Sequence, residues 1–395
     1  MRRLLPVLCV LVALLTSACS AWKPRQNYPG WSLWTRDEAP IDTAAFERAL
    51  QPALAAVEHA MGPFEEPVAV HAWNGGVALE SGVRGRVVDG EEPLLEVPGM
   101  GPARVRAFHS RGDGSLFSHG GIFLGEPEVS AAAHELVHAR IHELALAPPL
   151  WFEEGLASYI SDGALVDGVW QVDGMAFWPW KELRAQRLGD SEIAGLLALG
   201  EGEDHSLREN LLVHFLGWAL VFDVARHAPE AGWRDWLAQA LAAYGPKALE
   251  HDRAGAIARA RAALERTLDE DTPIEWLARL ESPDAGVRLA AARGAWKLAT
   301  PQVGDKLLAA IGREADPEVR TALVVNLLIG PGQTRYGWNN WWRMRREAVP
   351  HLKEPGLDDP VEAAAAARLY AAWRGRGGGK DAQEALRALR RLWEE

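Results

Sequence analysis

The feature that most constrains the fold of this chain is the pentapeptide His134-Glu135-Leu136-Val137-His138, which has the spacing H-E-x-x-H. The surrounding residues favour a helix, because Ser130 is a candidate N-cap, alanines follow it, and Pro148-Pro149 prevent the helix from continuing. Residues four apart on a helix lie one turn apart on the same face, so the two imidazoles point to one place. They can share one zinc ion, and Glu135 can reach a water molecule beside the ion without binding the metal itself.

A second helical segment follows after one short loop and supplies a third candidate ligand. It runs Trp151-Phe152-Glu153-Glu154-Gly155-Leu156-Ala157-Ser158-Tyr159. Glu154 would complete a site of two histidines and one carboxylate, with the fourth position of the zinc ion left to water. The alternative is a surface helix with two solvated histidines, since H-E-x-x-H also arises by chance. A carboxylate of the right type so close along the chain argues against that alternative.

The two segments together, H-E-L-x-H followed by P-x-W-x-x-E-G-x-A-x-Y, resemble the gluzincin metallopeptidases. The likeness is to the peptidase MA-like group of bacterial extracytoplasmic proteins, closely over residues 134–159 and more loosely over about residues 60–260. It implies that His134, His138 and Glu154 bind one zinc ion per chain and that Glu135 is the general base. Some gluzincins carry an acidic residue, one turn after the ligand glutamate, that orients a histidine. Ser158 stands there in this chain, so the groups that orient the ligands are either weaker or come from elsewhere.

The same resemblance implies two further parts of the site, a strand that binds substrate and a histidine that stabilises an oxyanion. The strand that runs into the metal helix contains Gly120, Gly121 and Ile122, and in gluzincins the matching edge strand binds the substrate backbone. The glycines could instead serve only a β-bulge. His214, in an apolar helical stretch, is a candidate for stabilising an oxyanion opposite the zinc ion, with a histidine at the edge of the core as the plainer reading.

The beginning of the chain reads as an export signal. Arg2-Arg3 precede an apolar run that is too short to span a bilayer as a helix, and small residues lead to Cys19. This resembles a bacterial lipoprotein signal over residues 1–19, in which Cys19 becomes the lipidated terminus; an ordinary secretory signal cut nearby is the alternative. Either way we expect export to the bacterial cell envelope, facing the periplasm or exterior. Cys9 is the one other cysteine, so any metal must be held by histidine and carboxylate.

We expect an α+β fold with two domains after an irregular tether over residues 20–41. Residues 42–269 form the gluzincin-like domain, with a small antiparallel or mixed sheet and the zinc-binding helices. Residues 270–395 form an all-α domain of HEAT-like repeats, because segments beginning at Ser282 and Ala315 share Asp, Pro and small apolar residues at an offset near 32. A segment beginning at Asp359 repeats this pattern more loosely. A plain extension of a helical bundle is the alternative. Between the second and third repeats, Tyr336–Arg346 is rich in tryptophan and arginine, which could bind a partner or close a hydrophobic gap.

These observations favour an exported, lipid-anchored zinc metallopeptidase that cleaves a peptide or protein substrate. One alternative is an inactive peptidase-like fold whose HEAT-like repeats recruit a protein partner in the envelope. Another is a zinc hydrolase that acts on a non-peptide amide. The net charge of −12 argues against nucleic-acid binding, which needs a basic face.

Overall fold

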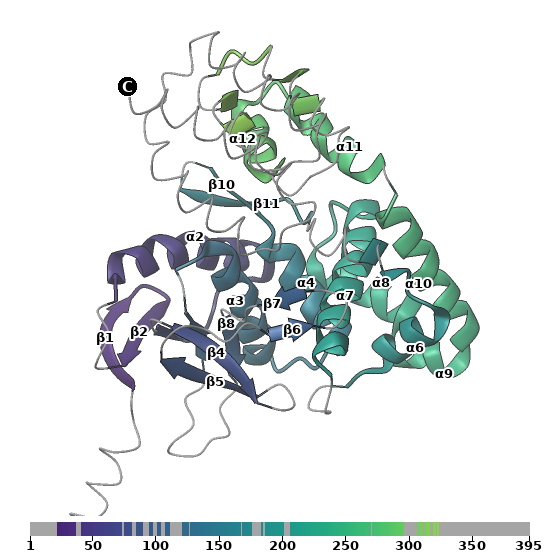
Figure 1. The fold of residues 1–395 in the computed structure, drawn as a ribbon, viewed down its shortest axis with the longest axis horizontal. Helices are drawn as coiled ribbons and strands as arrows, with labels where there is room; N and C mark the ends of the chain where they lie inside the picture. The colour runs from purple at the N-terminus through teal and green to yellow at the C-terminus, as the bar shows by residue number, and fades with distance from the viewer. Residues whose placement is uncertain are drawn as a thin grey trace, which may run out of the picture.

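The computed structural model describes most of the chain between residues 22 and 295 and a few residues beyond. The described residues are 22–36, 41–72, 75–80, 84–89, 95–97, 101–103, 107–110, 121–125, 127–166, 168–175, 183–184, 186–200, 206–269, 271–295, and scattered residues between 306 and 323. They form a mixed α+β structure in which the strands of residues 22–36 lie on one side and the helices of residues 233–267 on the other, with the helices Val129–Glu143 and Leu150–Ser161 between them (Figure 1). The signal segment with Cys19, the segment Tyr336–Arg346 and the repeat that starts at Asp359 lie outside the described residues.

The main sheet has five strands and is mixed. Its order is β1-β2-β3-β9-β8, with β1 at Trp22–Tyr28, β2 at Trp31–Arg36, β3 at Val68–Ala72, β9 at Gly121–Leu124 and β8 at Ala107–Ser110. β2 and β9 run parallel to β3, and β1 and β8 run antiparallel to their neighbours. Three two-stranded hairpins accompany it: β4 (Gly75–Glu80) with β5 (Arg84–Asp89), β6 (Leu95–Val97) with β7 (Gly101–Ala103), and β10 (Gly163–Val166) with β11 (Val169–Val172).

The expectation of an irregular tether over residues 20–41 is wrong for residues 22–36. These residues form the hairpin β1–β2, which turns at Gly30 with a φ of 81° and joins the sheet through β3. Trp31, Leu33 and Thr35 alternate into the interior, which is the pattern of a strand with one buried face. Pro24 is accommodated where the register of the hairpin shifts. The prolines and tryptophans of this segment therefore led to the prediction of a tether where the residues form strands.

The helices that carry or support the site are α2 to α10. Their bounds are α2 Thr43–Met61, α3 Val129–Glu143, α4 Leu150–Ser161, α6 Asp190–Ala198, α7 Leu207–His227, α8 Trp233–Tyr244, α9 Pro246–His251 and α10 Arg253–Thr267. The apolar residues Phe46, Leu50, Leu54 and Val57 of α2 are buried, and Asp42 caps this helix by accepting a hydrogen bond from the Ala45 amide at 3.0 Å. Among the helices of the described segments, we find none with the length and apolar character to cross a bilayer.

Helices α4 and α7 pack backbone to backbone. A Cβ atom on Gly217 would lie 1.8 Å from the Trp151 carbonyl oxygen, and one on Gly155 would lie 2.3 Å from the Gly217 backbone. Only glycine fits at either position, because real Cβ contacts are not that short. This close approach fixes the residues on α4 against those on α7.

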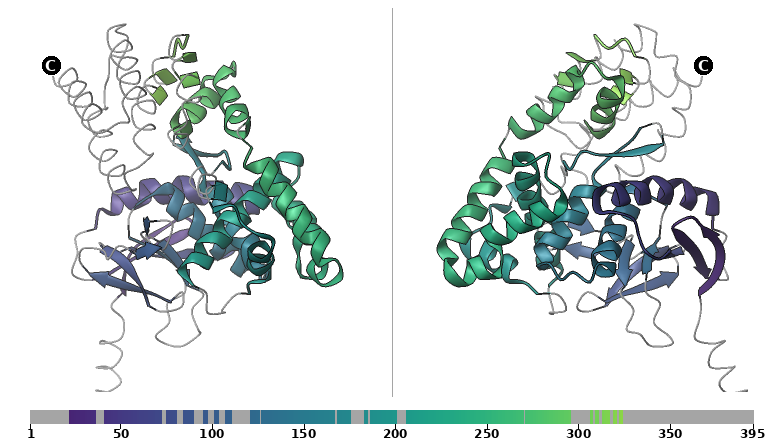
Figure 2. Two further views of the ribbon diagram at one scale, coloured as in Figure 1. Left: turned by 45° about the vertical axis from the view of Figure 1, so that its right-hand side comes forward. Right: turned by 180° about the vertical axis from the view of Figure 1, so that it is seen from behind.

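The C-terminal described helices lie at one end of the molecule. They are α11 (Asp271–Leu277), a 3-10 turn (Ala278–Glu281) and α12 (Ala285–Gly294), and the β10–β11 hairpin lies between α12 and α2 (Figure 2). Asp284 accepts from the Gly286 and Val287 amides, and Asp316, at the matching position of the next sequence repeat, accepts from the Val319 amide. The repeated Asp thus caps a helix start in both copies, which agrees with the sequence repeat without defining the type of repeat.

Candidate metal centre

Helix α3 presents His134 and His138 on one face, as the spacing predicted. Their ring centroids are 5.0 Å apart and the rings stand edge to face. The helix begins at Val129 after Glu128, so the prediction of Ser130 as N-cap is wrong by two residues. The error moves the helix start but not the face on which the imidazoles lie.

Helix α4 brings the Glu154 carboxylate to both imidazoles. Its Oε2 atom is 3.4 Å from His134 Nε2 and 3.4 Å from His138 Nε2. The three ligands predicted from the sequence are therefore neighbours in the structure, across the short loop between α3 and α4.

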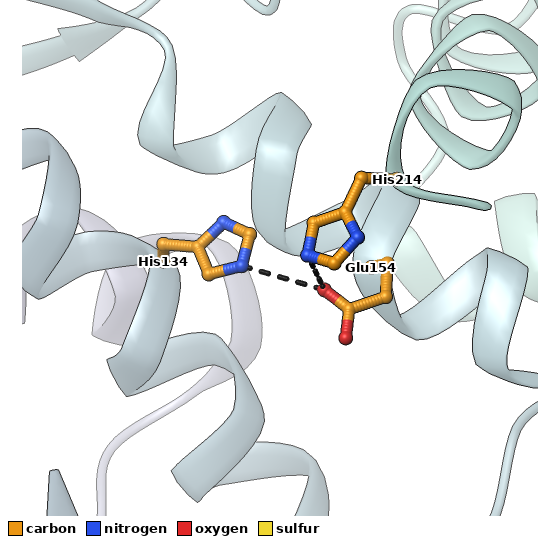
Figure 3. A group of neighbouring side chains, drawn as sticks. All are labelled: His134, Glu154 and His214. Atoms are coloured by element: carbon orange, nitrogen blue, oxygen red, sulfur yellow. Dashed lines mark ion pairs between the residues drawn. The ribbon is translucent and has the colours of Figure 1, made fainter. Parts of the chain in front are cut away.

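A fourth side chain, His214 from α7, joins this group. Its Nε2 lies 2.8 Å from the same Oε2 atom of Glu154, and its ring is stacked parallel to that of His134 at 5.7 Å (Figure 3). Ligand atoms of His134, Glu154 and His214 all lie within 4.8 Å of one another. Sequence reasoning placed His214 near the zinc ion, but as an oxyanion group and not among the candidate ligands.

This donor set fits a divalent cation. Glu154 Oε2 is buried and accepts no hydrogen bond, although three ring nitrogens lie within 3.4 Å of it. Such an orphaned carboxylate oxygen is costly unless a cation satisfies it. Ligands at about 2.0–2.1 Å from a tetrahedral zinc ion are separated by about 3.3 Å, close to the nitrogen–oxygen distances here. Imidazole and carboxylate are also the ligands that zinc takes in the absence of cysteine.

Two ring nitrogens that face away from Glu154 have acceptors of their own. His138 Nδ1 is 2.8 Å from Glu153 Oε1, and His214 Nδ1 is 2.6 Å from the Asn210 carbonyl oxygen. Partners of this kind fix the tautomer and orientation of ligand histidines. At the position of Ser158 the sequence left open whether the orienting groups are weaker or come from elsewhere. Glu153 lies beside His138 in this role, and the Ser158 carbonyl accepts a hydrogen bond from the Ser161 hydroxyl. The sequence signal that was missed is Glu153, the first glutamate of the pair Glu153-Glu154.

Electrostatics in the group favour a negative Glu154 carboxylate beside a protonated His138 and a neutral His134. Burial opposes the charge of Glu154, but the His214 and His138 imidazoles outweigh it and hold the pKa of Glu154 well below its usual value. Burial lowers the pKa of His134 to about 4. Burial also acts on His138, but there the Glu154 and Glu153 carboxylates raise the pKa well above its usual value. A cation between these groups would replace the proton on His138.

Glu135 is placed beside the group without being part of it. Its side chain is buried, with 7% exposure, and burial raises its pKa to about 7. The backbone of His109, in strand β8, hydrogen-bonds its carboxylate and partly offsets this rise. A carboxylate with a pKa near the working pH is suited to accept a proton and return it.

The prediction for the glycine-containing strand is wrong in its assignment of the sheet edge. Gly121 and Ile122 lie in β9, which is paired with β3 on one side and β8 on the other, while Gly120 lies outside the described residues. Gly121 has a φ of 136°, and a Cβ atom there would lie 2.3 Å from the Ala69 carbonyl oxygen, so this glycine serves the close approach to β3. Among the described strands, the edge nearest the metal helix is β8, whose His109 ring lies 6.3 Å from that of His138.

Comparison with models of known protein families, with curated proteins and with solved structures finds no match to this chain. We therefore infer the chemistry of the site from its own side chains.

Proposed function

We propose that this protein is a zinc metallopeptidase of the bacterial cell envelope, anchored by a lipid on Cys19. The observation that supports it most directly is the meeting of His134, His138 and Glu154, three residues of the H-E-x-x-H and downstream glutamate pattern, around an unsatisfied carboxylate oxygen. The buried Glu135 beside them supplies the acid–base group that the same pattern requires.

The chain's own groups have separable tasks in peptide hydrolysis. A bound Zn²⁺ would polarise the scissile carbonyl and lower the pKa of water. His134, His138 and Glu154 would hold the ion, and Glu153 keeps the His138 ring in its ligating orientation. Glu135 accepts the proton of the attacking water and delivers it to the leaving amine.

The substrate backbone would bind along strand β8, at the edge that faces away from β9. β8 pairs with β9 through one edge, and no further strand of the described residues pairs with its other edge. An extended peptide can add to such an edge through main-chain hydrogen bonds. The nearness of this edge to the metal centre supports the proposal, since the ring of His109 in β8 lies 6.3 Å from that of His138 and 5.8 Å from that of His142 on α3.

The direct test compares Glu135→Gln with the wild type in metal content and in hydrolysis of a peptide mixture. We expect the variant to retain zinc and to lose hydrolysis by at least about 100-fold, since general acid–base groups contribute about 10²–10⁴-fold. Glu250→Gln, an exposed glutamate on α9, is the matched control and should behave as wild type. Hydrolysis that survives both in Glu135→Gln and in the presence of a chelator would refute the proposal.

The second candidate is an adaptor without catalytic activity. It is favoured by the place of His214, which could close the metal site, and by the repeated Asp caps at Asp284 and Asp316, typical of stacked helical repeats that bind proteins. Zinc binding without cleavage of any peptide in the mixture would favour the adaptor.

A further inference from the structure

The tautomer of His214 determines what its free nitrogen can do. Nδ1 lies 2.6 Å from the Asn210 carbonyl oxygen, one turn back on α7, and a carbonyl can only accept a hydrogen bond. Nδ1 therefore carries the proton, and in the neutral ring Nε2 presents a lone pair. A nitrogen with a lone pair can bind a metal ion, but it cannot donate a hydrogen bond to an oxyanion.

The orientation of the ring toward Glu154 agrees with this assignment. His214 Nε2 is directed at Glu154 Oε2, 2.8 Å away, and ligand atoms of His134, Glu154 and His214 lie within 4.8 Å of one another. His138 has the same arrangement, with Nδ1 engaged by Glu153 and Nε2 directed to the carboxylate at 3.4 Å. Ligand histidines almost always donate their second ring N–H in this way.

We propose that His214 Nε2 is a further ligand of the metal ion in the resting protein. This inference rests on the metal centre of the proposed function. It adds a ligand to that centre in the resting protein. With His134, His138, Glu154 and His214 all bound, a tetrahedral ion has no position left for water, which is the composition of a closed site. Hydrolysis then requires that His214 leave the ion first, so the resting centre is latent.

The fold indicates how His214 would leave. Helix α7 cannot shift along α4, because Gly217 and Gly155 are in backbone contact one turn beyond the site. The His214 side chain, in contrast, is 25% exposed and so has a path toward solvent. Release is therefore a rotation of one side chain, and the other three ligands stay in place.

The experiment counts imidazole ligands in the zinc-loaded protein by extended X-ray absorption fine structure and measures zinc affinity by competition with a chelator. Wild type is compared with His214→Ala and with His227→Ala. His227 is the matched control, since it also lies on α7 and also places Nδ1 near a carbonyl one turn back, that of Asp223 at 2.7 Å, but it lies away from the centre.

We expect His214→Ala to lose one imidazole from the count and to bind zinc at least about tenfold more weakly, since even indirect partners of metal ligands account for about 10- to 100-fold. His227→Ala should match the wild type in both. An unchanged imidazole count and affinity in His214→Ala would overturn the inference and leave His214 an oxyanion group, with the proposed peptidase intact. If the wild type itself takes up no zinc, the proposed function fails together with the inference. The wild-type spectrum gives a count even where a variant does not fold: fewer than three imidazoles there would exclude His214 as an addition to His134 and His138.

Discussion

His138 Nδ1 lies 2.8 Å from Glu153 Oε1, and Glu153 directly precedes the candidate ligand Glu154. One helical turn thus supplies both a ligand and the carboxylate that orients another ligand. We predict that Glu153→Ala lowers zinc affinity about 10- to 100-fold, because a ligand histidine without its acceptor loses its orientation and some basicity. Chelator competition measures this, and Glu153→Gln, which keeps an acceptor oxygen, should lose less. Equal affinity in Glu153→Ala and wild type would contradict the prediction.

Gly217 should be intolerant of any side chain. A Cβ atom there would meet the Trp151 carbonyl oxygen at 1.8 Å, so Gly217→Ala must separate α4 from α7. We expect a loss of about 1–3 kcal/mol in the free energy of unfolding, as for other overpacked sites, and weaker zinc binding. Urea unfolding measures this loss, and Gly195→Ala is the control variant. Gly195 lies in α6 with open space around it, and alanine there should be neutral or stabilise by up to about 1 kcal/mol.

Asp173 should make stability depend on pH. Its side chain is buried, Oδ1 accepts from the Met175 amide at 2.9 Å, and Oδ2 has no hydrogen-bond partner. Burial raises the pKa of Asp173 from 3.8 to about 6. Because the folded pKa is the higher one, the stability linked to the protonated form is present below pH 3.8 and is lost as the pH rises through about 6.

Asp173→Asn keeps the Oδ1 acceptor and removes the charge. We expect it to raise the free energy of unfolding by up to about 3 kcal/mol at pH 8, with a gain that shrinks toward pH 4. Thermal unfolding across that pH range tests the sign. A gain of the same size at both ends would show that the charge of Asp173 is not the cause.

Cys19 should decide whether the protein partitions into membranes. We predict that Cys19→Ser abolishes labelling by a fatty-acid precursor and moves the protein from the detergent phase to the aqueous phase, because Cys19 is the proposed site of the lipid anchor. Cys9→Ser is the control, since Cys9 would leave with the proposed signal segment and its loss should change neither readout. Continued labelling of Cys19→Ser would exclude Cys19 as the lipidated residue.

The local part of the site could be predicted from the sequence. His134 and His138 are one helical turn apart, and Glu154 follows across one short loop, so spacing alone brings these residues together. The position of His214 depends on the packing of α7 against α4 through two glycines, which no pattern within α7 specifies. Glu153 was missed because adjacent helical residues point about 100° apart, and only the packing tells which of two glutamates faces which ring.

Other features could not be predicted from the sequence, because they depend on contacts between segments that are distant along the chain. Glu143 accepts hydrogen bonds from the Glu65 and Glu66 amides at 2.8 and 3.1 Å and pairs with Arg140. It thereby ties the end of the metal helix to the loop before β3. The identity of the sheet edge near the site also depends on strand order, since β8 pairs outside β9 although it precedes it in the chain.

The hairpin β1–β2 has a consequence for where this protein can work. Strand β1 starts at Trp22, so three residue steps connect it to Cys19, a reach of roughly 10 Å. With a lipid on Cys19, the sheet would be held directly against the bilayer surface and could not range through the surrounding space. The substrates within reach would then be polypeptides that themselves emerge from, or lie along, the same membrane.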